Sequence, residues 1–330
     1  MARFGAYIAG SGSCVPQRRL TNADLEKLVD TNDEWIVQRT GIRERRMAGA
    51  GESTVTLALQ AARNALDNAH VTADQLDLII VGTLTPELIT PSTACLLQEK
   101  LGMKRHIGAF DMGAACSGFV YSLATAAQFI QNGAYKNILV VGAETLTRII
   151  DYTDRGTCIL FGDGAGAVVL SATDDITRGI QAFELGADGM DSDMLYVPAG
   201  GSRLPASAET IQNRQHYLKM NGREIYKFAV HQMTNSLQKA MEACHLTAAD
   251  VKLVVPHQVN QRIIDSATEK MGFPKEKVFV NIDRYGNTSA ASVPLALDEA
   301  LRAGACGPGD WIIMVAFGAG LTWASVTVKM

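Results

Sequence analysis

Three polar residues, each inside a short motif, have the side chains that nucleophilic carbonyl chemistry requires. Cys116 lies in "DMGAACSGFV", His257 directly follows the apolar run "VKLVVP", and Asn287 lies in "RYGNTSAAS". A thiolate can attack a carbonyl carbon, and an imidazole and an amide can stabilise negative charge on a carbonyl oxygen. Taken singly, a cysteine is more often inert and buried, a histidine is more often structural, and Asn287 or Thr288 could merely cap a helix. A reaction centre therefore requires a fold that brings the three side chains together.

Small residues flank Cys116 on both sides, from position 113 to position 118. They predict a tight turn from a strand into a helix, with room for a substrate carbonyl against the backbone. At the N-terminus of a helix, the macrodipole and the unpaired N–H groups favour thiolate over thiol. We therefore expect Cys116 to be an activated nucleophile.

Composition excludes several classes of protein. The chain has 330 residues, of which 47% are hydrophobic, and a net charge of −4, with "RERR" as its longest basic run. A large core is possible, and a nucleic-acid partner is not expected. No apolar segment is long enough to span a membrane, and the N-terminus lacks the apolar region of a signal peptide. Six cysteines without CxxC pairs argue against a metal site and against a disulfide framework, so we expect a cytoplasmic protein.

The elements that must position the three residues can be read from hydrophobic patterns. Apolar, β-rich runs alternate with Ala-, Leu- and Gln-rich helical patterns, which predicts an α/β fold with a largely parallel sheet. The predicted strands are residues 76–82, 136–144, 166–170, 251–256 and 310–318.

An internal repeat divides the chain into two similar halves. "NALDNAHVTADQLDLIIVG" matches "KAMEACHLTAADVKLVVPH", with Val71 and Leu246 175 residues apart (246 − 71). "CSGFVYSLATAAQFIQNGA" matches "NTSAASVPLALDEALRAGA", with Cys116 and Asn287 171 residues apart (287 − 116). We therefore predict two duplicated halves, residues 1–172 with the cysteine and residues 173–330 with the histidine and asparagine, and an irregular insert near 184–215. Ligands of open α/β sheets bind beyond the carboxyl ends of strands, where the duplication would bring the three residues together.

Several motifs resemble one enzyme family over nearly the whole chain. They are "VDTNDEWIVQRTGIRERR", "ACSGF", "DRGTCILFGDGAGAVVL", "PHQVN", "GNTSAAS" and "FGAGLTW". Together they resemble β-ketoacyl-acyl carrier protein synthase III, the initiating condensing enzyme of type II fatty acid synthesis in the thiolase superfamily. The resemblance implies a thiolase-like fold, in which two duplicated α/β halves form a layered αβαβα arrangement.

The resemblance also implies a reaction and its residues. Cys116 would carry the acyl group taken from acyl-CoA, while His257 and Asn287 would activate the malonyl thioester on acyl carrier protein for decarboxylation and condensation. Backbone N–H groups of Cys116 and Ala319 would form the oxyanion hole. No metal or permanently bound cofactor would be needed, since acyl-CoA and malonyl-acyl carrier protein are the substrates.

Further binding residues follow from the same resemblance, which also implies a homodimer. The expected CoA contacts are Trp35, Arg39, Arg155, Gly222 and Asn260. The expected carrier-protein contacts are Lys227, Arg262 and Lys270, although Glu269 stands where a basic residue is common. The acyl pocket would include Thr90, Phe161 and Phe317. Thr90, where short-chain members have Phe, suggests a deeper channel for longer or branched acyl groups. Trp35 could instead be a core residue.

Other interpretations are weaker. "FGDGAGAV" fits a loose GxGxxA pattern but leads into a strand, whereas a dinucleotide fingerprint leads into a helix. A cysteine hydrolase also uses Cys, His and Asn, but the duplicated α/β plan argues against it. A biosynthetic thiolase would need a second catalytic cysteine. A condensing enzyme of secondary metabolism and a non-catalytic scaffold that binds acyl carrier protein remain as alternatives.

Overall fold

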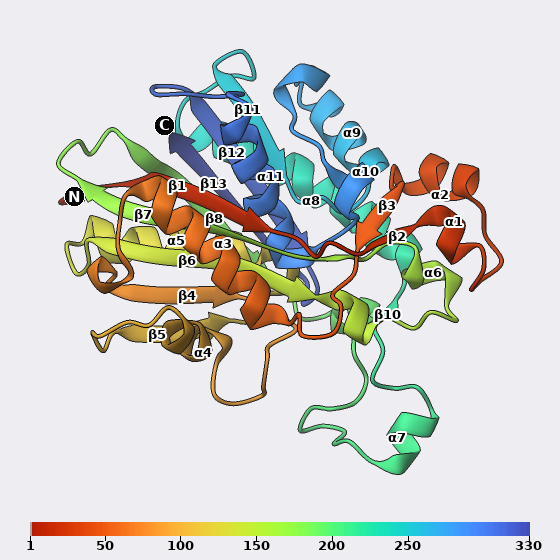
Figure 1. The fold of residues 1–330 in the computed structure, drawn as a ribbon. Coiled ribbons are helices and arrows are strands. Elements are labelled where there is room, and N and C mark those ends of the chain that lie inside the picture. The colour runs from red at the N-terminus through yellow and green to blue at the C-terminus, as the bar shows by residue number, and fades with distance from the viewer. Residues whose placement is uncertain (1) are drawn as a thin grey trace.

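Two mixed β-sheets are stacked with helices between them and on their outer faces (Figure 1). The computed structural model describes residues 2–330. The first sheet has the strand order β1-β7-β6-β4-β5. Its strands are β1 (Gly5–Cys14), β7 (Asp163–Thr173), β6 (Asn137–Thr145), β4 (Leu78–Gly82) and β5 (Gly108–Met112). The second sheet has the order β11-β12-β13-β8. Its strands are β11 (Val251–Pro256), β12 (Trp311–Gly318), β13 (Thr322–Lys329) and β8 (Gly179–Ala187).

The strands are only partly parallel, which corrects the expectation of a largely parallel sheet. β4 is parallel to β5 and β6, and β11 is parallel to β12. The pairs β1–β7, β6–β7, β12–β13 and β8–β13 are antiparallel. Only β12 and β13 are joined by a short turn, which makes that pair antiparallel, whereas the other antiparallel pairs join strands that lie farther apart in the sequence. All five predicted strands exist, with ends within three residues of the prediction.

Five layers result, so the predicted αβαβα arrangement is confirmed. The central helices α5 (Gly118–Gln131) and α11 (Ser292–Arg302) lie between the sheets and share one apolar core with both. Helices α3 (Thr54–Ala69) and α4 (Thr93–Lys100) cover the outer face of the first sheet. Helices α8 (Gly222–Ala243) and α9 (Gln261–Lys270) cover the outer face of the second.

Smaller elements surround the sheets. Near the N-terminus they are β2 (Arg19–Thr21), α1 (Asn22–Leu25), α2 (Asp33–Thr40) and β3 (Glu44–Arg46). Further along they are α6 (Arg155–Cys158), β9 (Leu195–Tyr196), α7 (Ala208–Gln212), β10 (Lys219–Met220) and α10 (Ile282–Tyr285). The predicted insert begins after β8, at residue 188, and the loop that carries α7 projects from the body (Figure 1). The predicted boundary at 172/173 falls at the last residues of β7.

The backbone confirms the first repeat and corrects the second. His70 is the residue directly after α3, and His245 is the second residue after α8. Both have the left-handed backbone conformation, with φ of 53° and 55°, and they are 175 residues apart (245 − 70), as predicted. The turns before α5 and α11 each contain one non-glycine residue with positive φ, Ala115 (45°) and Ser289 (49°), which are 174 apart (289 − 115). Cys116 therefore corresponds to Ala290, and Asn287 lies three residues earlier. The sequence match aligned Asn287 with Cys116 wrongly because α11 is three residues shorter than α5.

Candidate active site

Cys116, His257 and Asn287 line one small cavity between the two halves. Its remaining wall consists of Leu160, Phe161, Leu195, Met220, Ile225, Phe228, Val259, Phe317 and Gly318. The wall is almost entirely apolar, and the free interior volume is only about 40 Å³. The structure thus brings together the three residues that the motifs singled out, and it places the predicted acyl-pocket residues Phe161 and Phe317 beside them.

Cys116 lies in a one-turn 3-10 helix, Ala115–Ser117, that leads directly into α5. The end of β12 packs against this turn so closely that a Cβ at Gly318 would lie 2.6 Å from the Cys116 backbone nitrogen. Glycine is therefore required there, because a side chain would collide with the turn that carries Cys116. Burial raises the pKa of the Cys116 thiol to about 12 and so opposes the thiolate that a helix N-terminus would favour. The activated thiolate stays a prediction.

His257 directly follows β11, and its ring orientation is fixed on one side. Its backbone N–H donates to the Val315 carbonyl at 2.7 Å, and Nδ1 lies 2.6 Å from the Ser292 hydroxyl. Nε2 is buried and has no hydrogen-bond partner within residues 2–330. Burial lowers the pKa of His257 to about 3, so the imidazole is neutral at physiological pH. The unpaired Nε2 is the group available to a substrate in the cavity.

Asn287 is held by its backbone and by one side of its amide. Its N–H donates to Leu160 O at 2.8 Å, and its carbonyl accepts from Gly162 N at 3.0 Å. The side-chain Oδ1 accepts from the backbone N–H of Ser289 at 2.8 Å. Since the amide oxygen is already engaged, the amide nitrogen is left as a donor for a ligand.

Ala319, the second predicted oxyanion donor, directly follows Gly318. Its carbonyl lies 3.2 Å from the Thr322 hydroxyl, which also contacts Ala114 O at 3.1 Å and Ser117 Oγ at 3.3 Å. Thr322 thereby fixes the "FGAG" turn against the turn that carries Cys116. The role of the Ala319 N–H stays a prediction.

A wide cleft adjoins the small cavity. Leu160 and Met220 line both, and the cleft has a volume of about 580 Å³. Five predicted binding residues line it together with Trp35: Arg39, Gly222, Lys227, Asn260 and Arg262. Arg39 and Arg155 place their guanidinium carbons 4.8 and 5.0 Å from the centre of the Trp35 ring. Trp35 is half-buried, so it is not simply a core residue.

The other predicted contacts have different positions. The Asn260 side chain caps α9 by accepting from Arg262 N at 2.9 Å, and it donates to Arg39 O at 2.9 Å. Its amide is therefore already used within the protein. Lys270 lies at the end of α9, outside the residues that line the cleft, and Thr90 is exposed and outside this chain's cavity.

Neither a metal centre nor a membrane segment emerges from the described structure. Across residues 2–330, no three or more His, Cys, Asp or Glu side chains are grouped so that they could hold a metal ion. No helix in that range has the length and apolarity to cross a membrane.

Comparison with known proteins identifies the family. Two family models for 3-oxoacyl-(acyl-carrier-protein) synthase III match residues 110–189 and 241–330, the second being its C-terminal model. A β-ketoacyl-(acyl-carrier-protein) synthase III from Caldanaerobacter subterraneus is 51% identical over 327 residues, which cover 99% of this chain and 98% of the relative. The chain belongs to the 3-oxoacyl-(acyl-carrier-protein) synthase III family.

Solved structures agree with this assignment. The synthase III from Aquifex aeolicus superimposes with a TM-score of 0.91 at 47% identity, covering 99% of this chain and 100% of that one. The priming β-ketosynthase of the R1128 polyketide pathway has the same TM-score of 0.91 but only 35% identity. This synthase is accordingly an acyl-transferring condensing enzyme of fatty acid synthesis with the thiolase-like fold, as the motifs indicated.

Some residues of the synthase site were missed by sequence reasoning. Ile225 and Phe228 wall the cavity from the start of α8, and Arg223 and Tyr226 face the cleft from the same turns. Ser292 orients His257, and Leu195 and Met220 come from the irregular insert and β10. The alternation of the α8 residues between cavity and cleft fits helical spacing, but no local signal distinguished that helix from the other amphipathic helices.

Proposed function

We propose that this synthase transfers an acyl group from acyl-CoA to Cys116 and condenses it with malonyl-acyl carrier protein, releasing CO2 and a 3-oxoacyl-acyl carrier protein. The observation that carries the proposal is the meeting of Cys116, His257 and Asn287 in one apolar cavity, which adjoins a cleft of ligand size. An apolar lining favours an acyl chain over water, and the cleft can hold the carrier of the thioester.

In the first step, the Cys116 sulfur attacks the thioester carbonyl and CoA leaves. The negative oxygen of the tetrahedral intermediate lies between the backbone N–H groups of Cys116 and Ala319. The CoA nucleotide binds in the cleft, where the Trp35 ring and the guanidinium groups of Arg39 and Arg155 can sandwich an adenine. Asn260 and Gly222 line the same cleft, where the pantetheine arm would lie, and the Asn260 amide is already bonded to Arg39 and Arg262.

In the second step, the malonyl thioester loses CO2, and two neutral donors stabilise the enolate oxygen. The Gln258 backbone N–H donates to Ser292 Oγ at 3.4 Å, which leaves the Ser292 proton free to point at His257 Nδ1. Nδ1 then accepts, so the proton of the neutral ring sits on Nε2 and points into the cavity. The Asn287 amide nitrogen supplies the second hydrogen bond, and the enolate carbon attacks the acyl-Cys116 thioester.

Acyl carrier protein is an acidic partner, and it would meet basic residues at the mouth of the cleft. Lys227, Arg262 and Arg223 line that mouth, while Lys270 lies further along α9. Lys227 is paired with Glu224 at 2.9 Å, so part of its charge is already compensated. Arg223 therefore supplements the predicted set of carrier-protein contacts.

A homodimer fits the surface of the first sheet. β5 is an edge strand, and an edge strand without a partner is a site for association. Leu88 and Ile89, which precede Thr90 in the loop before α4, are 50% and 93% exposed. Thr90 would then reach the partner's acyl pocket, and the starter chain would depend on both subunits.

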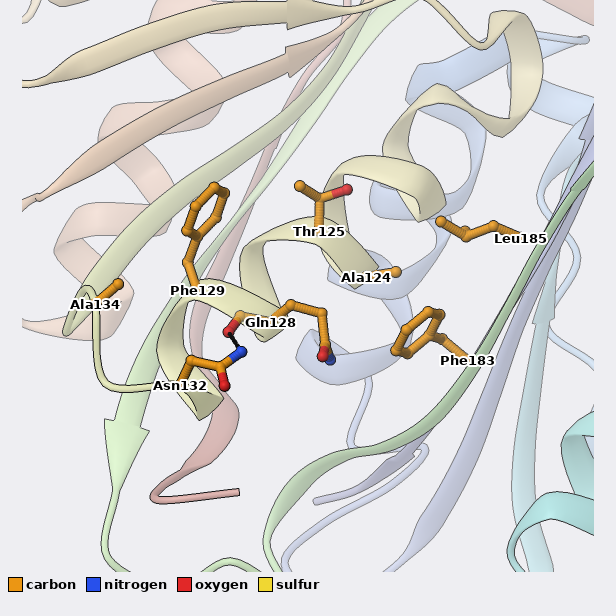
Figure 2. A pocket seen from close by; sticks show the side chains of 8 residues that line it. All are labelled: Ala124, Thr125, Gln128, Phe129, Asn132, Ala134, Phe183 and Leu185. Carbon is orange, nitrogen blue, oxygen red and sulfur yellow. Dashed lines mark hydrogen bonds between the residues drawn. The ribbon is translucent and has the colours of Figure 1, made fainter. Parts of the chain in front are cut away.

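Another apolar pocket, lined by Phe129, Phe183 and Leu185, lies between α5 and β8 (Figure 2).

We place the reaction in the cytoplasm. All six cysteines are free, although three of them are at least partly accessible, and a reducing compartment keeps such thiols unpaired. No resident cofactor enters the reaction, since both carbon donors arrive as thioesters.

Mass spectrometry of the intact protein after exposure to acetyl-, isobutyryl- or long-chain acyl-CoA tests the proposal. We expect one stable acyl adduct, which Cys116→Ala abolishes. The matched control is Cys158→Ala, which removes another buried cysteine and should keep the adduct. Hydrolysis of acyl-CoA without a stable adduct would instead identify a hydrolase.

A further inference from the structure

Arg45 is a charged side chain that lies wholly inside the protein, and the proposed mechanism gives it no role. It is the central residue of β3, near the end of the motif "TGIRERR", and it is 0% exposed. Arg43 of the same motif is exposed, as is usual for arginine. The burial of Arg45 therefore needs an explanation.

All hydrogen bonds of the Arg45 guanidinium go to neutral oxygens. Nη1 donates to Leu20 O at 3.1 Å and to Asn22 Oδ1 at 2.9 Å, and Nη2 donates to Ile159 O at 2.6 Å. Nε is buried and has no partner within residues 2–330. Burial lowers the pKa of Arg45 to about 10, so the side chain stays charged at physiological pH. Since apolar side chains can often replace even a buried ion pair without loss of stability, stability alone does not account for this arginine.

One side of the guanidinium is anchored near the N-terminus. Leu20 lies on β2, where it pairs with Arg45 across the β2–β3 ladder, and Asn22 is the first residue of α1. The Asn22 amide is itself held, because its Nδ2 donates to Asp33 Oδ1 and to Ile42 O, both at 2.8 Å. Nη1 therefore binds two oxygens whose own positions are fixed.

The other side of the guanidinium reaches the segment that holds Asn287. Ile159 directly follows α6, and residues 159–162 connect α6 to β7. Within this segment, Leu160 O accepts from Asn287 N at 2.8 Å, and Gly162 N donates to Asn287 O at 3.0 Å. Both of these backbone bonds of Asn287 thus go to the segment that Nη2 binds at Ile159.

The stem of Arg45 also packs against this part of the site. A Cβ at Gly162 would lie 3.0 Å from the Arg45 Cβ, and a Cβ at Gly286 would lie 3.3 Å from it. Gly286 directly precedes Asn287 and has a φ of 64°, a conformation that favours glycine. Arg45 therefore lies close to both chain segments of the Phe161–Asn287 bridge.

We propose that Arg45 is a positioning residue for condensation, because its guanidinium holds the segment 159–162 in place and so aims the Asn287 amide at the malonyl thioester. A planar guanidinium can bond to β2 and to Ile159 at the same time, whereas an ammonium is a single point of charge. None of its hydrogen bonds reaches the turn that carries Cys116, so acylation should not depend on it. The inference rests on the proposed function, in which Asn287 acts in condensation.

Single turnovers test the proposal by separating the two steps. Wild type, Arg45→Met and Arg45→Lys are first acylated at Cys116 with acetyl- or isobutyryl-CoA, whichever wild type accepts. Each acyl-enzyme is then mixed with malonyl-acyl carrier protein, and the rate constant of 3-oxoacyl product formation is measured. We expect this rate constant to fall about tenfold in both variants, because Met makes no bond to Ile159 and Lys cannot bridge to it from β2. A loss of folded protein alone would lower the amount of product and leave the rate constant unchanged.

Two further variants complete the test. Asn22→Ala removes one anchor of Nη1, so we expect a fall of about threefold, which can be measured even if the Arg45 variants fail to fold. Arg43→Met removes the exposed arginine of the same motif and should keep the wild-type rate constant.

A wild-type rate constant in Asn22→Ala or in a folded Arg45 variant would overturn the proposal, as would full recovery in Arg45→Lys. An equal fall in the rate of acylation would also overturn it, because the effect would then not pass through Asn287. Absence of the acyl adduct in wild type would overturn the proposed function instead.

Discussion

The turn before α5 and the turn before α11 have the same backbone but different chemistry. Each is a single 3-10 turn, and each contains a residue with positive φ, Ala115 or Ser289. Each is packed against the central strand of the other half, since Gly142 of β6 meets Ala290 and Gly318 of β12 meets Cys116. The position that carries the sulfur in the first turn carries only the methyl group of Ala290 in the second.

This difference shows how a duplicated scaffold divides a reaction. The first half supplies the nucleophile, and the second supplies two neutral donors, His257 and Asn287, from segments beside its own turn. The supporting strands diverge in the same way. Glu144 on β6 corresponds to Gly318 on β12 (318 − 144 = 174, the spacing of the turns). This position is a buried carboxyl on β6, whereas on β12 it is a glycine that lets the strand pack closely against the turn that carries Cys116.

His257→Ala should have the largest effect on condensation, because it removes a hydrogen-bond donor that only the second half supplies. We expect condensation to fall by about 10²–10³-fold, the usual effect of losing one donor to a developing oxyanion. Acylation of Cys116 should persist. His231→Ala, an exposed histidine on α8, is the control and should leave both rates unchanged. Equal loss of both steps would mean that the halves do not divide the work.

Glu144→Gln should change how stability depends on pH. Burial raises the pKa of Glu144 from 4.5 to about 7, so between these pH values the folded protein holds a proton that the unfolded chain has lost. This stabilisation is complete below pH 4.5 and is lost as the pH rises through 7, at up to about 1.4 kcal/mol per pH unit. Urea unfolding at pH 5 and pH 8 should show a smaller change in Glu144→Gln than in wild type. An identical pH dependence of unfolding in wild type and Glu144→Gln would show that Glu144 is not the group whose protonation stabilises the folded protein.

Ser292→Ala tests a second difference between the halves. Ser292 is the first residue of α11, and the first residue of α5 is Gly118, which has no side chain. Loss of the 2.6 Å contact to Nδ1 leaves the tautomer and orientation of His257 unfixed. One neutral hydrogen bond is worth about 1 kcal/mol, so condensation should slow roughly fivefold while acylation is unchanged. Ser122→Ala, a buried serine within α5, serves as the control. A wild-type condensation rate in Ser292→Ala would show that Ser292 does not fix the orientation of the His257 imidazole.

Asp151→Asn should have the smallest effect. Arg214, in the insert between β8 and β10, forms an ion pair with Asp151, and its Nε donates to Asp151 Oδ2 at 2.8 Å. The pair holds the insert that supplies Leu195 to the cavity. Because Arg214 is 47% exposed, solvent screens the pair, and KM for acyl-CoA should rise only about twofold. Asp174→Asn, at an exposed carboxyl, should leave KM unchanged, and an unchanged KM in Asp151→Asn would remove the insert from substrate binding.

The sequence predicted the parts that short motifs determine. Cys116, His257 and Asn287 were found because each stands in a distinctive local pattern, and the layered fold followed from the repeat and the family resemblance. The equivalence of Cys116 with Asn287 was wrong by three residues, since letters alone do not show where a helix becomes shorter. The burial that raises the pKa of Cys116 could not be predicted, because burial is a tertiary property. Ser292 lies in the motif "GNTSAAS", but its contact with His257 could not be predicted, because it depends on which segments pack together.

The most direct test of the division between the halves is to measure both steps in Asn287→Ala, with intact-protein mass spectrometry for acylation and 3-oxoacyl product formation for condensation. We predict a wild-type level of acyl-Cys116 and a loss of about 10²–10³-fold in condensation. Wild-type condensation, or loss of the acyl adduct together with condensation, would contradict the account.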